Sequence, residues 1–410
     1  MTSPEVATVE GKPVIKVALW YDRPQAYSGG LNYFRNLVYA LSKLKGSGIS
    51  PYVFFGTDVD SATIGEFRQF ATVVTTRLLH RKSLMWLAHR VLFKYFGSLV
   101  LIQLLVGRYG IKIVSHGEHV YAKARPFRIV YWIPDFQYLH LPELFPAWFV
   151  PQQTRLIRTV AQHSDVVVLS SHAALGDFRQ IVGDSVTAQV AVLPFVSQPT
   201  MMSDEESAQV RRSGLKDRYG VAGRFFFLPN QFWVHKNHAV VFEAIRLARD
   251  QGIGMRLVCT GNLKDYRKRD ESHADQLANF IATNRLEDHI SILGSINYSD
   301  VLRLMEESIA VINPSRFEGW SSTVEEAKSL GKRVILSEIP VHREQAPPLA
   351  TYFQPDDVAE LTRALIEHWN SSTDVDVQAQ RRRAKEALDR RTLEYARGYT
   401  KVILDLVAEK

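Results

Sequence analysis

The sequence predicts an α/β protein built from two doubly wound, Rossmann-like domains. The chain has 410 residues, which is long for one hydrophobic core and natural for two. Short apolar runs alternate with amphipathic helical patterns, as expected for buried parallel strands joined by helices. A polar stretch without strand periodicity, at residues 198–216, divides this series into two.

The first series begins with the apolar run Val14 to Tyr21, followed by a helical pattern that starts near Ser28. Its later strand candidates are Tyr52 to Gly56, Ile111 to Gly117, Phe127 to Ile133, Asp165 to Ser171 and Val190 to Phe195. We therefore assign residues 14–197 to an N-terminal domain and residues 198–216 to a linker.

The second series occupies residues 217–376, and a charged amphipathic pattern at residues 377–410 predicts a final helix that packs back toward the first domain. The strand candidates are Arg224 to Asn230, Met255 to Asn262, Ile290 to Ile296, Ile309 to Ser315 and Arg333 to Glu338. The helix candidates are Asn237 to Asp250, Ala274 to Arg285, Ser299 to Glu307 and Thr323 to Leu330. Ligands of open α/β sheets bind beyond the carboxyl ends of the strands, so we expect the site in a central cleft between the domains.

Composition narrows the class of partner and the compartment. The formal net charge of +7 and the pI of about 9.3 favour anionic partners such as nucleotides, phosphates or acidic lipid. Nucleic acid is disfavoured because neither a zinc-knuckle spacing nor an aromatic ribonucleoprotein motif is present. The lone Cys259 excludes a disulfide within the chain, and no secretory signal opens it, so we expect a cytoplasmic protein. Residues Met1 to Lys12 are expected to be a frayed tail.

The segment Thr76 to Gly110 combines many large apolar residues with basic ones, and two interpretations of it stay open. Its uncharged run from Tyr95 to Gly107 is too short to span a bilayer. One interpretation is a pair of helices that pack their apolar side on the first sheet. The other is a peripheral contact of the basic side with an anionic membrane, which would be the inner face of the plasma membrane.

The residues with the clearest chemical meaning lie in an acidic stretch that contains Glu318, Glu325 and Glu326. A turn follows Glu318, and a helix is predicted to begin at its end, capped by a serine or threonine. Free N–H groups at a helix start favour an anion such as a diphosphate. A neighbouring carboxylate can accept the two vicinal hydroxyls of a ribose. We expect Glu326 to do this from the first turn, and Glu325, about 100° around the helix, to face solvent.

This stretch resembles the E-x7-E motif of retaining glycosyltransferases with the GT-B fold, in particular glycosyltransferase family 4. The resemblance implies that Glu326 holds the nucleotide ribose and that Glu318 lies by the donor sugar. It also implies that the backbone of the turn between them meets the sugar and the diphosphate. In this chain that turn is Gly319, Trp320, Ser321, Ser322 and Thr323, where the family usually has Gly-Phe-Gly-Leu-Pro.

The segment Pro229 to Ile245 resembles the family's second donor-binding element. Lys236 takes the place of the lysine that binds the diphosphate, and Asn237 is expected to cap the following helix. Gln231 stands where many relatives have an arginine, so one positive charge is missing from the expected donor site. We suggest that Arg316 or His235 supplies this positive charge instead.

The first half resembles the family at three further places. Asp135 follows a strand at the position of the family's Asp, although Pro134 stands where His is common. Gly29 and Gly30 fit a glycine loop that lets backbone approach the donor diphosphate or the acceptor. His116 is expected either to contact acceptor hydroxyls or, with Glu118 and His119, to be a coincidental cluster rather than a metal site.

The resemblance implies a retaining transfer of a hexosyl or deoxyhexosyl group from a nucleotide-diphosphate sugar to a hydroxyl of a glycan or lipid-linked acceptor, in cell-surface polysaccharide synthesis. It implies no cofactor and no essential metal, since Lys236 and the helix start neutralise the leaving diphosphate. The D-x-D sequences at Asp58 to Asp60 and Asp374 to Asp376 are therefore interpreted as turns. The alternatives are a non-catalytic sugar-nucleotide-binding protein and, on the same fold, an epimerase or a phosphorylase. An NAD-dependent oxidoreductase is disfavoured because no G-x-G-x-x-G follows the first strand.

Overall fold

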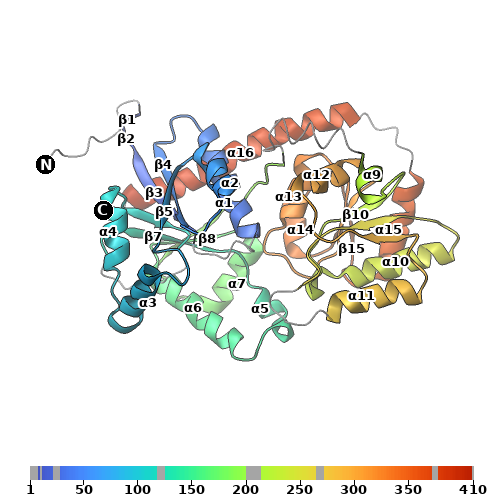
Figure 1. Ribbon diagram of the computed structural model, residues 1–410, viewed down its shortest axis with the longest axis horizontal. Coiled ribbons are helices and arrows are strands. Elements are labelled where there is room, and N and C mark those ends of the chain that lie inside the picture. Colours follow the sequence, from blue (N-terminus) through green and yellow to red (C-terminus); the bar gives the residue numbers. More distant parts are fainter. Residues whose placement is uncertain are drawn as a thin grey trace. The chain divides into compact units, whose positions relative to one another are not determined.

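The chain folds into two α/β units, each built on its own parallel sheet (Figure 1). The structure is a computed structural model that describes residues 8–9, 12–21, 28–117, 125–199, 214–264, 272–371 and 377–408. Unit 1 comprises residues 1–196 and 390–410, and unit 2 comprises residues 197–389. Most of the predicted linker lies outside the described residues, and helix α16 (Val377–Ala408) contributes to both units.

Unit 1 contains a seven-stranded sheet in the order β5-β4-β3-β6-β7-β8-β9, with every neighbouring pair parallel. Its strands are β3 (Ile15–Trp20), β4 (Ile49–Gly56), β5 (Thr72–Thr76), β6 (Ile113–Ser115), β7 (Arg128–Ile133), β8 (Val166–Leu169) and β9 (Gln189–Val192). Its helices are α1 (Ser28–Lys43), α2 (Ser61–Arg68), α3 (Leu84–Phe96), α4 (Val100–Arg108), α5 (Gln137–His140), η1 (Pro142–Leu144), α6 (Phe149–His163) and α7 (His172–Val182). The order reverses between β3 and β6, as in a doubly wound sheet.

Unit 2 contains a six-stranded parallel sheet in the order β12-β11-β10-β13-β14-β15. Its strands are β10 (Phe226–Leu228), β11 (Leu257–Cys259), β12 (Ile290–Ile292), β13 (Val311–Asn313), β14 (Val334–Ser337) and β15 (Ala350–Phe353). Its helices are α9 (Leu215–Tyr219), η2 (Val234–Lys236), α10 (His238–Asp250), α11 (Ser272–Thr283), α12 (Tyr298–Glu307), α13 (Ser322–Ser329), α14 (Pro340–Gln345) and α15 (Val358–Asn370). Here the order reverses between β10 and β13.

Successive side chains of the short buried strands in unit 2 lie on opposite faces of the sheet and belong to two separate hydrophobic cores. Phe226 and Leu228 pack with α10 and α15 on one face of the sheet. Phe227, the residue between them, packs on the opposite face with α12 and α13. Both faces are therefore covered, which explains why these strands are continuous apolar runs in the sequence.

The predicted fold class, two Rossmann-like α/β domains, is confirmed, with two local differences. The edge strands β5 and β15 were not predicted. The expected frayed start contains a short antiparallel pair, β1 (Thr8–Val9) with β2 (Lys12–Pro13). Among the described residues, no helix combines the length and the apolarity needed to cross a membrane.

Candidate functional site

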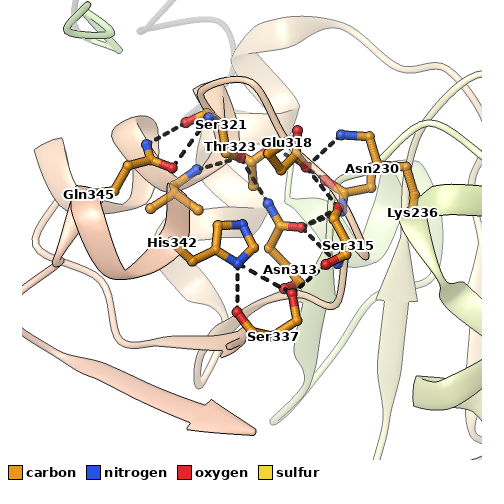
Figure 2. Close-up of polar contacts among 11 residues, drawn as sticks. Asn230, Lys236, Asn313, Ser315, Glu318, Ser321, Thr323, Ser337, His342 and Gln345 are labelled. Atoms are coloured by element: carbon orange, nitrogen blue, oxygen red, sulfur yellow. Dashed lines mark hydrogen bonds and ion pairs between the residues drawn. The ribbon is translucent and has the colours of Figure 1, made fainter. Parts of the chain in front are cut away.

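The candidate site of unit 2 lies where β10 and β13 end, at the point where the strand order reverses (Figure 2). Asn230 follows β10, and Asn313 is the last residue of β13. The Asn230 Nδ2 donates to Asn313 Oδ1 over 3.0 Å, which joins the two buried loops across the reversal. Open α/β sheets bind ligands at this point, because the loops of the two strands diverge there.

An ion pair between Lys236 and Glu318 forms the charged part of the site. Lys236 Nζ lies 2.6 Å from Glu318 Oε1, and the two side chains are only 13% and 10% exposed. The Ser315 hydroxyl also donates to this oxygen over 2.7 Å. Burial alone would raise the pKa of Glu318, but Lys236 and these hydrogen bonds outweigh it and hold that pKa below its usual value. Glu318 is therefore a carboxylate at neutral pH.

The turn after Glu318 is held by side chains rather than by glycine. Asn313 Nδ2 donates to Ser321 Oγ over 2.8 Å, and this hydroxyl accepts from Val324 N as the N-cap of α13. Gln345 on α14 bonds both the amide and the carbonyl of Ser321, over 3.2 and 3.0 Å. The start of α13 and its free N–H groups are thus fixed beside the ion pair. The predicted caps and the helix end at Gly331, with a φ of +67°, are confirmed.

The neighbouring glutamates of α13 differ in their surroundings. Glu326 is buried one residue beyond the first turn, and Tyr298 on α12 donates to its Oε1 over 2.9 Å. Burial raises the pKa of Glu326 to about 7, and the Tyr298 hydrogen bond offsets only part of that effect. The prediction that Glu325 faces solvent is wrong. Glu325 is buried too, because Gln345 covers it and donates to it over 3.2 Å.

A buried histidine that the sequence analysis did not single out lies under this site. His342 Nδ1 is 2.8 Å from the carbonyl oxygen of Ser337, which can only accept, so Nδ1 carries the proton. Burial lowers the pKa of His342 to about 4, and its Nε2 lone pair has no hydrogen-bond partner among the described residues. Electrostatic interactions with Glu318 and Lys236 place His342 near the ion pair.

The other residues predicted to bind donor line the same loops with distinct roles. Trp320, Gly319 and Ser322 are half-buried, and Thr323 is buried 3.4 Å from Asn230 Oδ1. The Gln231 Oε1 accepts from Asn262 N over 2.7 Å and so joins the loops after β10 and β11.

Two suggested local roles differ in the structure. Arg316, suggested as a replacement charge, is paired with Asp356 at 2.8 Å. Asn237 stands at the N-cap of α10, but its side chain does not cap that helix. It donates instead to the carbonyl of Pro355 over 2.7 Å.

The predicted residues of unit 1 lie at the carboxyl ends of β6 and β7. Asp135 Oδ1 accepts from Gln137 N over 3.0 Å, in a turn after β7. His116 is buried with a φ of +64°. Its Nδ1 lies 2.6 Å from Ser115 Oγ and its Nε2 lies 2.9 Å from Tyr33 OH. Both nitrogens are therefore used inside the unit, and a role toward an acceptor would require their rearrangement.

The remaining sequence features separate into helix starts and residues outside the description. Gly29 and Gly30 form the first turn of α1 rather than a loop. Asp58 lies in the predicted turn after β4, where Val59 N donates to the carbonyl oxygen of Gly56 over 3.3 Å, whereas Asp60 is the N-cap of α2 and accepts from Thr63 N over 2.8 Å. Four named residues lie outside the described ranges: Glu118, His119, Asp374 and Asp376. Within those ranges, no three His, Cys, Asp or Glu side chains are grouped as a metal site would need.

Sequence comparison places the family resemblance on unit 2. Residues 222–387 match the sequence profile described as "Glycosyl transferases group 1". A segment of 133 residues is 26% identical to the O-antigen chain mannosyltransferase RfbU of Salmonella typhimurium, and covers 32% of this chain and 35% of that protein. The chain thus matches about a third of the length of this curated relative.

Structural comparison extends over nearly the whole chain. A glycosyltransferase from Rickettsia africae superposes with a TM-score of 0.63 at 15% identity, over 97% of this chain and 100% of that one. Anabaena HepE in complex with UDP and glucose superposes with a TM-score of 0.64 at 14% identity, over 95% of this chain and 100% of that one. Sucrose-phosphate synthase from Thermosynechococcus elongatus superposes with a TM-score of 0.63 at 14% identity, over 97% of this chain and 100% of that one. The chain therefore has the fold of the GT-B glycosyltransferases over nearly its whole length.

Proposed function

We propose that the chain is a retaining glycosyltransferase that moves a sugar from a nucleotide-diphosphate sugar to a hydroxyl of a glycan or lipid-linked acceptor. One observation carries the proposal. Lys236, Glu318 and Glu326, separated by up to 90 residues of sequence, gather with the start of α13 where the strand order of unit 2 reverses. The named relative is an O-antigen chain mannosyltransferase, which supports polysaccharide synthesis as the setting.

In this proposal each group has a separate task. Lys236 uses one of its three N–H donors on Glu318, and the other two are assigned to the diphosphate. The N–H groups at the start of α13 are assigned to the same phosphates. Glu326 accepts the two ribose hydroxyls, and Glu318 lies by the donor sugar. We assign the acceptor to unit 1, near Gly30 and Asp135.

The reaction proposed for this arrangement needs no nucleophile from the protein. The bond between the anomeric carbon and the phosphate oxygen breaks while the acceptor oxygen bonds to the same face of that carbon. The acceptor proton passes to the departing phosphate oxygen. Negative charge grows on the diphosphate as the bond breaks, so Lys236 and the backbone N–H groups stabilise the transition state more than the ground state.

A panel of nucleotide sugars tests the proposal. We expect one of the UDP-, GDP-, dTDP- or ADP-sugars to raise the melting temperature, because a ligand that binds only the folded chain stabilises it by mass action. We also expect transfer to continue in the presence of EDTA, since Lys236 and α13 supply the positive charge. No shift with any donor class, or loss of transfer restored by Mg²⁺ or Mn²⁺, would contradict this description of the site.

Tyr298→Phe tests the environment of Glu326. In the native chain the Tyr298 hydroxyl donates to Glu326 and favours its ionised form. Its removal is expected to raise the pH at which donor affinity is half-maximal by about one unit, because a hydrogen bond to a charged group contributes about 1.5 kcal/mol. The measurement is donor affinity as a function of pH. A uniform loss of affinity at every pH would show that Tyr298 contacts the donor instead.

A further inference from the structure

The outer surfaces of α3 and α4 expose large apolar side chains. Leu84 is 86% exposed, Phe96 75%, Tyr95 68% and Leu104 66%. Met85, Leu87, Val91 and Val100 are also exposed. Single exposed apolar residues are common on soluble proteins, but a group of eight on two consecutive helices marks an interaction surface.

The exposed apolar residues are arranged at helical spacing. Leu84, Leu87, Val91 and Tyr95 recur every three or four residues and form one stripe along α3. His89 is buried on another face of the same helix, where Phe93 packs against the core. In α4, Val100 and Leu104 are exposed, whereas Ile102 and Val106 are buried. Each helix therefore has one apolar face toward the core and a second one outward.

We call this second face the outer face of α3 and α4, defined by Leu84, Leu87, Val91, Tyr95, Val100 and Leu104. The interpretation of residues 76–110 as helices packed on the first sheet is confirmed by the core contacts of α3 and α4, but the solvent side of these helices is apolar as well as basic. The core contacts of Phe93, Leu101 and Leu105 account for the inward side alone.

The charges in the segment that contains the outer face have one sign. Residues 67–117 contain eight Lys or Arg and no Asp or Glu. Two of the cations lie beside aromatic rings of α3: Arg90 is 4.9 Å from the Trp86 ring centre and Lys94 is 5.2 Å from that of Tyr95. Lysine, arginine and interfacial aromatic residues around an apolar stripe form the pattern of helices that lie in a lipid headgroup layer.

We propose that the outer face of α3 and α4 docks the chain on the surface of an anionic lipid bilayer. Leu84, Leu87, Val91 and Tyr95 would enter the boundary between headgroups and acyl chains. Arg90, Lys94 and the basic residues before α3 would meet lipid phosphates. A second copy of the chain fits this face less well, because a symmetric contact would bring the positive charges of the two copies together.

Docking would determine which acceptor the enzyme meets. If the proposed transfer function holds, a chain held on a bilayer by unit 1 takes a lipid-linked acceptor rather than a free glycan. Docking itself does not depend on that function, because the donor residues Lys236, Glu318 and Glu326 belong to unit 2.

Flotation of the full chain with lipid vesicles tests docking. We expect it to float with vesicles of phosphatidylglycerol mixed with phosphatidylcholine, to bind phosphatidylcholine alone far more weakly, and to dissociate as salt rises. Equal binding to both vesicle types, or no binding to either, would overturn the proposal.

Two variants locate the contact. Leu84→Ser/Tyr95→Ser is expected to lose most vesicle binding, because both side chains are exposed and their removal leaves the fold intact. Arg90→Gln/Lys94→Gln is expected to weaken binding by at least about tenfold, since each cation near an anionic surface contributes about a fivefold factor. The matched control is Arg382→Gln/Arg383→Gln, which removes two exposed charges from the unit 2 part of α16 and should bind nearly as the native chain does.

The same variants separate docking from the other hypotheses. Native vesicle binding by Leu84→Ser/Tyr95→Ser would overturn the assignment to this face, as would a dimer in light scattering that this variant abolishes while vesicles have no effect. Thermal shifts with nucleotide sugars are expected to be unchanged in both variants. A chain that floats but responds to no donor would contradict the proposed transferase function alone. A chain that responds to a donor but never floats would contradict docking alone.

Discussion

Lys236→Met is expected to abolish sugar transfer and to lower the free energy of unfolding by about 3 kcal/mol. The lysine lies 2.6 Å from Glu318, and both side chains are almost entirely buried. Removing one partner leaves the other charge in a site where water cannot solvate it, so the loss is larger than for a surface pair. Urea unfolding and a transfer assay with the donor identified by thermal shift measure the two effects.

A double-mutant cycle separates the structural role of Lys236 from its proposed role toward the diphosphate. Glu318→Gln keeps an oxygen that can accept from the Ser315 hydroxyl, as Glu318 Oε1 does over 2.7 Å in the native chain. The variant Lys236→Met/Glu318→Gln no longer contains the unpaired charge, and we expect it to regain most of the lost stability. Transfer should stay absent in it. If transfer returned together with stability, Lys236 would be only a structural partner of Glu318.

An exposed pair of the same type provides the control. Lys401 Nζ also lies 2.6 Å from a carboxylate, that of Asp405, but these side chains are 75% and 50% exposed. Lys401→Met is expected to change stability by less than about 1 kcal/mol and to leave transfer unchanged. The contrast tests burial, because the distance between the charges is the same in both pairs.

The strands that the sequence analysis missed, β5 and β15, both lie at sheet edges, although the edge strands β9 and β12 were predicted. Inner strands such as β8 and β14 are fully buried, and their sequences, VVVL and VILS, are almost entirely apolar. The missed β5 and β15 are edge strands with few buried side chains, and their sequences, TVVTT and ATYF, show no clear apolar periodicity. Edge strands contact the core on fewer sides, and their sequences are correspondingly less constrained.

The site was predictable where its residues belong to one local motif. Spacing within a turn and a helix start is enough to place Glu318 just before α13 and Glu326 one residue beyond its first turn. No local spacing connects Tyr298 to Glu326 or Gln345 to Glu325, since these contacts depend on how α12 and α14 pack on α13. The error about Glu325 has this origin: helical periodicity gives a direction, but the neighbouring helix decides whether that direction is solvent.

Glu326→Gln is expected to stabilise the ligand-free chain above neutral pH. Burial raises the pKa of Glu326 to about 7 from an ordinary value of 4.5, so the folded chain binds the proton more tightly than the unfolded chain. Stability therefore falls as pH rises from 4.5 to about 7 and stays low above it. Glutamine carries no charge and avoids this loss. The gain should be absent below pH 4.5 and on the order of 2 to 3 kcal/mol at pH 8, measured by urea unfolding at each pH.

The same substitution is expected to weaken donor binding by at least about thirtyfold, because it removes a charged acceptor from the ribose hydroxyls at a cost of about 2 kcal/mol. In the native chain, donor affinity should rise with pH up to about 7, as Glu326 ionises. The loss of affinity in Glu326→Gln should accordingly be largest at alkaline pH and smallest in acid.

Glu325→Gln is the matched control, one residue away on the same helix and equally buried. Glu325 accepts from Gln345 and lies 3.9 Å from Lys328, so its charge has partners that favour it. We expect this variant to bind donor as the native chain does and to gain no stability at pH 8. Greater stability together with weaker binding, found in Glu326→Gln alone, would show that the chain keeps a destabilising buried carboxyl because the ligand needs it. The same result in both variants would mean that the spacing of the two glutamates does not select the ligand-binding one.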